Sequence, residues 1–329
     1  MANGDTTASR LGLVNNTGTV VDALFLKVFS GEILTTFEEF NVMKGLHTMR
    51  TISNGKSAQF PVTGIADAKY HTPGENIADG ANSYLSQIKH AEKVINIDDV
   101  LLASTFISNI DELKNHYDVR SIYAQELGKA LAKRFDLATM KVLVAASRSA
   151  ATITGGKAGI QIDSNSGGVA ALSGAEIQAA LFSAAQKLDE NDIPDDGQRF
   201  AILKPKDYYT LISSGEEVVN RDFGGRGDVA SGRIPMVAGI NLYKSNHLSD
   251  IAADLAGVNT GDGSESVQND VFGGAEAGEG SAIGTVKLLD LATESDYKVE
   301  LQGSLFVAKY AMGHGILRPE AAFEIKEIA

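Results

Sequence analysis

The sequence predicts an α+β protein built from two domains. Three patterns support this: strand signals over residues 48–97, a helical period over 109–147, and alternating helix and strand signals after a Gly-rich linker. A chain of 329 residues with 43% hydrophobic content is long enough to bury a substantial core. We therefore expect the first domain to hold the long helix and the second domain to begin near residue 172.

The composition excludes several kinds of site. The chain has no Cys, so it has no disulfide, no thiolate metal site and no Cys nucleophile. Its 6 His residues are scattered singly, and no two have the spacing of metal ligands. We expect neither a metal nor a cofactor.

The charge is unevenly distributed along the chain. Residues 1–171 carry 16 Lys+Arg against 17 Asp+Glu, and residues 172–329 carry 13 against 25; the differences of −1 and −12 sum to the net charge of −13. An acidic half repels a phosphate backbone, and no basic patch is evident. Tight or sequence-specific DNA binding is therefore not expected.

No targeting or membrane segment is predicted. The first residues lack the apolar core of a signal peptide, and no stretch approaches the ~18 apolar residues of a membrane span. We expect a soluble protein that makes no membrane contact and is used without secretion.

An N-terminal arm is predicted over residues 1–47. Residues 1–23 are polar and aperiodic, which is typical of a flexible segment. The stretch Leu24–Phe37 is apolar enough to need a packing partner. It could latch onto another subunit or form a peripheral helix on its own domain, and the pattern alone leaves both possibilities open.

The signals over residues 48–97 predict an extended β-hairpin. Asn54-Gly55 is a strong hairpin-turn signature, and it lies between the strand candidates Met49–Ser53 and Lys56–Val62. The whole segment has few apolar residues with which to form a core of its own. It therefore predicts a two-stranded projection that rests on a partner.

A long helix is predicted over about 109–147. Residues recur at three- and four-residue steps, with a mean spacing of about 3.6, the period of an amphipathic helix. They are Leu113, Tyr117, Ser121, Ala124, Leu127, Leu131, Phe135, Ala138, Val142 and Ala145. At ~1.5 Å per residue such a helix is roughly 55–60 Å long, which exceeds what one compact domain needs. We interpret it as a spine.

A second α+β domain is predicted after a Gly/Ser/Asn-rich linker at 151–171. Ser173 and Glu176 form a capping-box signature at the start of a helix. A short buried strand is expected to follow at Phe200–Leu203. We assign residues 172–283 to this domain.

Residues 245–286 are predicted to be a long, mobile surface loop. They contain no Lys or Arg, seven acidic residues and many Gly. The acidic residues Asp262, Glu265 and Asp270 lack the spacing of a calcium loop, so calcium binding is not favoured. A strand pattern returns at 284–292 and is expected to rejoin the first domain, which makes the second domain an insertion.

No motif in the chain predicts an enzyme, and no catalytic residue is assigned. Gly55-Lys56-Ser57 resembles the end of a phosphate-binding loop, but Arg50 stands where that motif needs Gly. His314 lies between two glycines, away from any Ser or carboxylate pattern of a catalytic triad. We expect it to be structural or to lie at a subunit contact.

The most specific signal is the run KYAMGHGILRPEAA, Lys309–Ala322. It closely resembles the C-terminal signature of the major capsid proteins of T7-like short-tailed bacteriophages (podophages). Further blocks resemble the same family in the same order: LFLKVFSGEILTTF, NGKSAQFPV, TPGEN, NHYDVRS and GTVKLLDLA. Together the blocks span residues 24–322. Within the run, Gly313 and Gly315 are expected to let the backbone bend around His314.

The resemblance implies the Hong Kong 97-type (HK97-like) capsid fold. Its parts are an N-terminal arm, an extended β-hairpin loop at 48–97, a peripheral domain at 98–171 and 284–329 with the spine helix, and an axial domain at 172–283. The implied function is that of a major capsid protein. Such proteins assemble as hexamers and pentamers into the icosahedral head that encloses the double-stranded DNA of a tailed bacteriophage.

The resemblance also implies partners and a location. A separate scaffolding protein is expected because the arm begins at once, together with a portal protein and, as an option, decoration proteins. Assembly is expected in the host bacterial cytoplasm, and the final location is the virion. The acidity of the chain is expected to keep the packaged DNA from adhering to the inner wall.

The extended loop is expected to carry the contacts between subunits. It should lie over a neighbouring subunit, with the arm as a second clasp, because many weak repeated contacts make a cooperative shell. The residues expected at this contact are Phe60, Tyr70, Glu75, Lys89 and Glu92. Two alternatives remain: a non-viral, encapsulin-like compartment shell of the same fold, and a soluble ligand-binding α+β protein.

Overall fold

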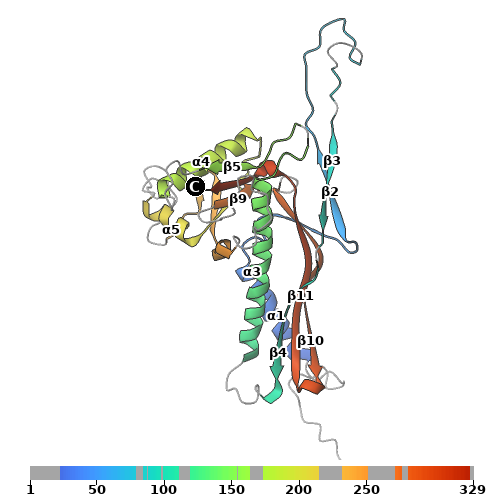
Figure 1. The fold of residues 1–329 in the computed structure, drawn as a ribbon, viewed down its shortest axis with the longest axis vertical. Helices are drawn as coiled ribbons and strands as arrows, with labels where there is room; N and C mark the ends of the chain where they lie inside the picture. The colour runs from blue at the N-terminus through green and yellow to red at the C-terminus, as the bar shows by residue number, and fades with distance from the viewer. Residues whose placement is uncertain are drawn as a thin grey trace, which may run out of the picture. The chain divides into compact units, whose positions relative to one another are not determined.

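The structure is a computed structural model, drawn in Figure 1. It describes residues 23–78, 84–86, 88–97, 99–110, 119–153, 155–163, 173–214, 232–250, 271–275 and 281–326. The α-helices in these residues are α1 (Ala23–Phe40), α3 (Val119–Ser147), α4 (Gly174–Glu190) and α5 (Pro205–Ser214). Short 3-10 helices are η2 (Asn246–Asp250), η4 (Val299–Leu301) and η5 (Pro319–Ala321).

The strands confirm the α+β class. They are β1 (Thr48–Thr51), β2 (Ser57–Thr63), β3 (His90–Asn96), β4 (Leu101–Ser108), β5 (Ile160–Asp163), β6 (Arg199–Leu203), β7 (Met236–Val237), β8 (Ile240–Lys244), β9 (Val271–Ala275), β10 (Ile283–Lys298), β11 (Gly303–Ile316) and β12 (Ala322–Lys326). They form three sheets, with the orders β1-β10-β11-β4, β5-β12-β9-β6-β8-β7 and β2-β3.

The chain divides into two compact units. Unit 1 comprises Met1–Asn41, Asp98–Phe135 and Leu289–Met312. Unit 2 comprises Val42–Ile97, Asp136–Leu288 and Gly313–Ala329. The predicted inserted domain therefore belongs to unit 2, and the two-stranded segment at 48–97 belongs to the same unit.

In unit 1, helices α1 and α3 pack on one face of the β4–β11 pair. The rings of Phe37, Phe135 and Tyr310 meet with centroids 6.0 to 6.4 Å apart, and Ile33 is fully buried. Gly128 of α3 allows α1 to come this close, because a Cβ there would lie 2.9 Å from the Cβ of Thr36. The apolar stretch Leu24–Phe37 was expected either to latch onto another subunit or to form a helix on its own domain. From residue 33 onward it packs as a helix on its own domain.

In unit 2, the six-stranded sheet forms the core with α4 against it. Strand β6 is buried along its whole length, and α4 contacts β5, β12 and α5. The predicted capping box is present: the Ser173 hydroxyl accepts the Glu176 N–H at 3.3 Å, and the Glu176 carboxylate accepts the Ser173 N–H at 2.7 Å. This reciprocal bonding holds the pKa of the Glu176 carboxyl below its usual value.

Two strands of this sheet lie where the sequence predicts irregular structure. Strand β5 lies within the expected linker, and β9 lies within the expected acidic loop. Strand β9 is central, antiparallel to both β12 and β6, with Gly273 opposite Phe323 on one side and opposite Ala201 on the other. Its glycines resemble loop composition, but here Gly273 and Gly274 pair with a strand on either side. The expectation of a continuous loop over 245–286 is therefore wrong at β9.

The predicted hairpin across Asn54-Gly55 is wrong in its pairing. Gly55 does adopt a positive φ of 116°, so the chain turns there. Strand β1, however, pairs in parallel with β10, and β2 pairs antiparallel with β3. The turn therefore passes the chain from one sheet to another, because each strand finds its partner far along the sequence.

The long helix is present as α3, which runs through both units. Residues 111–118, part of its predicted start, lie outside the described residues. The predicted positions Ala124, Leu131 and Phe135 are buried. Towards the C-terminal end the buried face broadens, and it takes in Met140, Leu143, Val144 and Ala146. A single stripe at the 3.6-residue period therefore describes only the first half of α3.

Candidate functional site

The β2–β3 ribbon is the first candidate surface. The two strands pair antiparallel from Ser57↔Asn96 to Thr63↔His90. At the root of the ribbon Ala58 and Ile95 pair and are buried. Beyond this pair the described residues of the ribbon have no core of their own: in β2, exposed side chains alternate with half-buried ones.

The run Lys309–Ala322 includes the residues against which β3 packs, Gly313 and Gly315, and we call these two glycines the seat of the ribbon. It covers the end of β11, η5 and the start of β12. A Cβ on Gly315 would lie 2.6 Å from Cγ1 of Ile95, and a Cβ on Gly313 would collide with the carbonyl oxygen of Asn96. Neither glycine has a positive φ, and β11 continues through both. The expectation that these glycines bend the chain is wrong: they leave room for β3 to approach.

The structure places the predicted contact residues along the ribbon and its connecting loop, not in one cluster. Phe60 is half-buried, with the Arg50 guanidinium 5.6 Å from its ring centroid. Tyr70 is fully exposed, at 102%. Glu75, Lys89 and Glu92 are exposed.

A small polar cluster orders the loop near Glu75. The Tyr84 hydroxyl donates to the Glu75 carboxylate and accepts the N–H of Thr72 at 3.1 Å. His71 Nε2 lies 2.9 Å from the Glu75 carbonyl oxygen, and its ring centroid lies 5.1 Å from that of Tyr84. Glu75 therefore fixes the local shape of the loop in addition to carrying an exposed charge.

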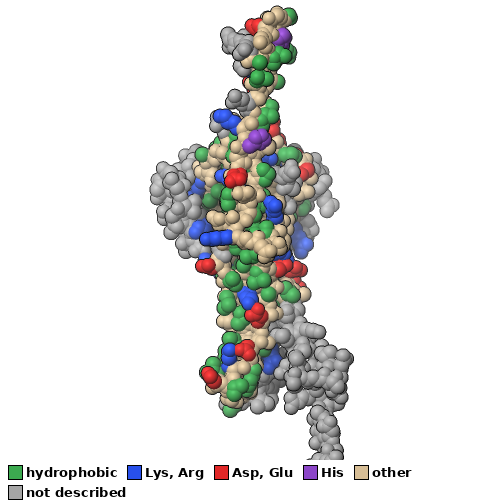
Figure 2. Space-filling view, turned by 90° about the vertical axis from the view of Figure 1, so that its right-hand side faces the viewer, with side chains coloured by type: hydrophobic (Ala, Val, Ile, Leu, Met, Phe, Trp, Pro, Cys, Tyr) green, Lys and Arg blue, Asp and Glu red, His purple; other side chains and the backbone are tan. Residues whose placement is uncertain are grey.

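Large apolar side chains are exposed along the ribbon and loop. They are Ile65, Tyr70, Ile77, Leu85, Ile88 and Val94. Figure 2 faces this side of the molecule and shows hydrophobic atoms in green among the backbone along the narrow ribbon. Exposed apolar groups gathered on an element without its own core mark an interaction surface.

A second group of exposed apolar side chains lies in unit 1. The register of β4 with β11 places Leu102 opposite Lys309 and Phe106 opposite Leu305, on the face away from buried Phe306. Leu102 is 55% exposed. Among the strands that the structure describes, β4 lies at the edge of its sheet, so no described strand pairs with its outer side. Just before β11, Tyr297 at the end of β10 and Val299 and Leu301 in η4 are also exposed.

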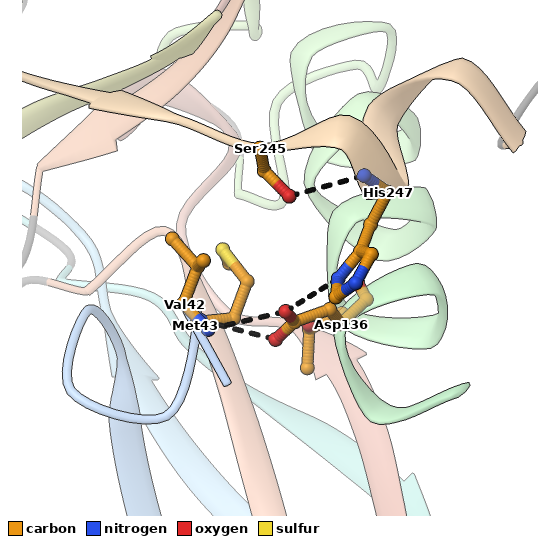
Figure 3. A network of polar contacts seen from close by, with 6 residues as sticks. Val42, Met43, Asp136, Ser245 and His247 are labelled. Carbon is orange, nitrogen blue, oxygen red and sulfur yellow. Dashed lines mark hydrogen bonds and ion pairs between the residues drawn. The ribbon is translucent and has the colours of Figure 1, made fainter. Parts of the chain in front are cut away.

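A buried carboxylate organises the polar interior of unit 2. Asp136 is 0% exposed and accepts the backbone N–H groups of Val42 and Met43, each at 3.1 Å. His247 Nδ1 lies 2.9 Å from the same carboxylate. Figure 3 shows these groups reaching Asp136 from two other segments, the chain at Val42 and Met43 and the chain at His247. The carboxylate therefore ties α3 to the chain before β1 and to η2.

Two histidines share one threonine hydroxyl in the same unit. His47 Nε2 lies 2.6 Å and His314 Nδ1 2.8 Å from the Thr285 Oγ1 atom. His47 Nδ1 lies 2.7 Å from the carbonyl oxygen of Met43. Burial lowers the pKa of both imidazoles, that of His314 to about 4, with the neighbouring His47 as its second cause. His314 is thus structural in this unit, one of the two roles expected for it.

This arrangement does not read as a catalytic site. A hydroxyl beside an imidazole is the pattern of an activated nucleophile, but Thr285 is 0% exposed and His47 is buried, so no substrate reaches the pair.

Among the described residues no three His, Cys, Asp or Glu side chains are placed to hold a metal ion. No helix in the described part of the chain is long and apolar enough to cross a membrane.

Sequence reasoning did not find Asp136, His47 or Thr285. The Asp136 bonds join residues 93 and 94 positions apart, and the His47 bond to Thr285 joins residues 238 apart. Nothing in the local sequence marks such pairs. The one available signal was a single acidic residue inside the mostly apolar second half of α3, which a buried, hydrogen-bonded carboxylate explains.

Comparisons with known proteins agree with the resemblance. A family model described as Gp10A-like: Major capsid protein matches residues 59–326. The major capsid protein of Escherichia phage T7 is 38% identical over 319 residues, which cover 91% of this chain and 90% of that protein. A solved capsid structure of Cyanophage P-SCSP1u is 40% identical with a TM-score of 0.74 and covers 98% of each chain. The mature capsid of bacteriophage PhiM1, 19% identical with a TM-score of 0.68 over 87% of each chain, shares the fold.

Proposed function

The chain belongs to the Gp10A-like family of major capsid proteins, and we propose that its β2–β3 ribbon is the contact by which each copy holds a neighbour. The family membership defines the role: the protein is a structural component of the icosahedral head of a tailed bacteriophage, and not an enzyme. The fold is Hong Kong 97-type. The encapsulin-like compartment shell is not favoured, because the matching family and its relatives are phage capsid proteins.

The exposure of the ribbon carries the proposal. Two strands without a third are only marginally stable in water, and this pair is buried only at its root. Ile65 is 73% exposed and Tyr70 is fully exposed. Burial of one such side chain contributes about 1.5–3 kcal/mol. A shell supplies the partner surface many times over, so modest contacts sum to a stable assembly.

We assign different roles to the five residues. Tyr70 is the apolar anchor, because an exposed aromatic ring offers large area at low entropic cost. Phe60 lies nearer the root and holds the ribbon on Arg50. Glu75 shapes the loop through Tyr84, whereas Lys89 and Glu92 provide exposed charges of opposite sign for matching a neighbour.

The open face of β4 and β11 is a second proposed contact between copies. Contacts that join copies into one ring of subunits do not by themselves join that ring to the next one. A closed shell therefore needs more than one interface per subunit. Leu102 and Phe106 form an apolar surface of this kind on unit 1, separate from the ribbon in sequence and in unit.

The family resemblance supports a proposal for the remaining parts of the assembly. Hexamers and pentamers of this chain would form the shell around a scaffolding protein, with a portal protein at one vertex and decoration proteins as an option. Assembly would take place in the host cytoplasm. The excess of 12 acidic over basic residues in residues 172–329, from 25 against 13, would limit adhesion of DNA to the wall.

Shortening the ribbon tests the proposal. Because Thr63 pairs directly with His90, an Asn-Gly turn in place of residues 64–89 keeps β2 and β3 but removes the exposed loop. We expect soluble, cooperatively melting subunits that form no closed shells in electron micrographs after co-expression with the scaffolding protein. Normal particles from this variant would refute the ribbon contact.

A point variant refines the test. Tyr70→Ala should reduce the yield of closed shells, whereas Tyr123→Ala, an exposed tyrosine of α3 outside both proposed surfaces, should not. Equal yields from the two variants would remove Tyr70 from the contact while leaving the rest of the ribbon in place.

A further inference from the structure

The His47–Thr285–His314 cluster joins three segments of unit 2. His47 directly precedes β1, Thr285 lies in β10, and His314 lies in β11. Strand β1 pairs with β10 next to this point, with Met49 opposite Thr285. The cluster is therefore a polar joint within a region whose surroundings, such as Val286 and Met43, are buried and apolar.

The hydrogen bonds determine where the protons lie. The Met43 carbonyl accepts only, so His47 Nδ1 carries a hydrogen and donates it. In the neutral ring His47 Nε2 is then an acceptor, and the Thr285 hydroxyl donates to it. The Thr285 oxygen in turn accepts from His314 Nδ1–H. All three bonds are satisfied with both imidazoles neutral.

Acid conflicts with this arrangement. A proton on His47 Nε2 takes away the acceptor of the Thr285 hydroxyl hydrogen, because both imidazoles then donate to the same oxygen unless His314 changes tautomer. A proton on His314 Nε2 leaves the bonds intact but introduces a charge into a largely buried site. A second proton then places two like charges across one hydroxyl group.

The charged and titratable groups around the pair do not remove this conflict. His47 is influenced by Asp136 of α3, whose negative charge favours protonation, but burial has the larger effect and lowers the His47 pKa. The Asp136 carboxylate already accepts two backbone N–H groups and lies against His247. His47 faces His314 and lowers the His314 pKa further. Thr285 and the Met43 carbonyl, which bond these imidazoles directly, are neutral.

The cluster lies beside the seat of the ribbon. His314 stands between Gly313 and Gly315, whose backbones contact Asn96 and Ile95 of β3. A change in the position of His314 therefore acts on the two residues that hold the root of the ribbon.

We propose that His47, Thr285 and His314 form an acid-sensitive latch that keeps the root of the ribbon in place while both imidazoles are neutral. Protonation of the latch loosens the junction of β1, β10 and β11 and with it the seat of β3. The latch gives the shell protein a way to change its ribbon contact in response to pH, which goes beyond the assembly role of the ribbon itself.

The sign of the effect follows from linkage. A folded-state pKa below the unfolded value of 6.5 means that the unfolded chain binds more protons as the pH falls. Stability is then fully present above pH 6.5 and is lost between pH 6.5 and about 4. At pH 5, protonation of these imidazoles in the unfolded chain should make the unfolding equilibrium constant more than about tenfold larger than at pH 7.5.

The experiment compares the full-length chain with His314→Gln and with His90→Gln. Gln carries a polar amide but does not titrate, and His90 is an exposed histidine of β3 that serves as the matched control. Urea unfolding of unassembled subunits between pH 7.5 and 4.5 should show a smaller acid-induced loss for His314→Gln than for the wild type and His90→Gln. Identical pH dependence in all three proteins would overturn the latch.

A second measurement separates a latch from a merely structural histidine and covers the case in which His314→Gln folds poorly. Hydrogen exchange of the wild-type chain, corrected for intrinsic rates, should show that β1 and β3 lose protection on going from pH 7 to 5 while β6 keeps it. Loss of protection in β6 to the same degree, or none in β1 and β3, would contradict a local latch.

Discussion

The backbone of Gly315 lies directly against the side chain of Ile95, and a Cβ on residue 315 would come within 2.6 Å of Ile95 Cγ1. The same strand offers Gly313 to the carbonyl oxygen of Asn96. These two contacts explain why the run Lys309–Ala322 has a glycine on either side of its histidine. The spacing of two places both glycines on the same face of β11, toward β3.

Gly315→Ala and Gly313→Ala should therefore destabilise the protein. Overpacking of this kind costs about 1–3 kcal/mol, and Gly313→Ala should be the worse of the two because the carbonyl oxygen it meets belongs to the backbone and cannot rotate away. Thermal melting of the purified subunits measures the effect. Gly45→Ala is the matched control, since a Cβ at that glycine meets nothing within 4 Å. Equal melting temperatures for all three variants would contradict the close approach.

Local signals predicted the elements whose cause is local. The capping box at Ser173 and Glu176, the buried strand that became β6 and the helical period of α3 all depend on residues within a few positions of one another. The six sequence blocks similarly identified the family, since a family resemblance is read directly from the order of residues.

Pairing across the chain could not be predicted in the same way. Asn54-Gly55 correctly marked a turn, but the partner of β1 is β10, more than 230 residues away. Gly273 and Gly274 have the composition of a loop and nevertheless lie in a central strand, because two neighbouring strands satisfy their backbone groups. The sequence drew attention to His314, but its pairing with Thr285 and His47 was not predicted, because these residues are distant in sequence.

Asp136→Ala should be among the most destabilising single changes in unit 2. It leaves the buried N–H groups of Val42 and Met43 without their acceptor and removes the partner of His247. Each unsatisfied buried group costs about 1–3 kcal/mol, so the free energy of unfolding should fall by roughly 3 kcal/mol or more. Urea denaturation at pH 7 measures this. Glu126→Ala is the control, because Glu126 is an exposed acid of the same helix that pairs with Lys129. It should change the free energy of unfolding by less than about 1 kcal/mol. If Glu126→Ala lost as much stability as Asp136→Ala, Asp136 would have no special role.

Glu324→Gln should show that the ion pair at the C-terminal end of α3 depends on charge. Arg148 Nε donates to Glu324 Oε2 at 2.8 Å, and the side chains of the pair are 5% and 0% exposed. Glu324→Gln removes the buried negative charge that faces the guanidinium, and breaking a buried ion pair in this way typically costs about 3–5 kcal/mol. The double variant Arg148→Met, Glu324→Leu should recover part of that loss, because it removes both buried charges. A double variant less stable than Glu324→Gln, measured by the same urea titration, would contradict this explanation.

The open face of unit 1 can be tested without disturbing its core. Leu102 and Phe106 are exposed on the side of β4 away from Phe306 and Tyr310, so Leu102→Ser and Phe106→Ser should leave the melting temperature of isolated subunits within a few degrees of the wild type. If this face joins copies in the shell, the double variant should give fewer closed particles, or particles that dissociate at lower urea concentration. Ile122→Ser, which changes an exposed apolar residue of α3, controls for the loss of surface hydrophobicity. Shells of normal yield and stability from the double variant would show that this face stays open in the assembled head and that the ribbon and other surfaces join the copies.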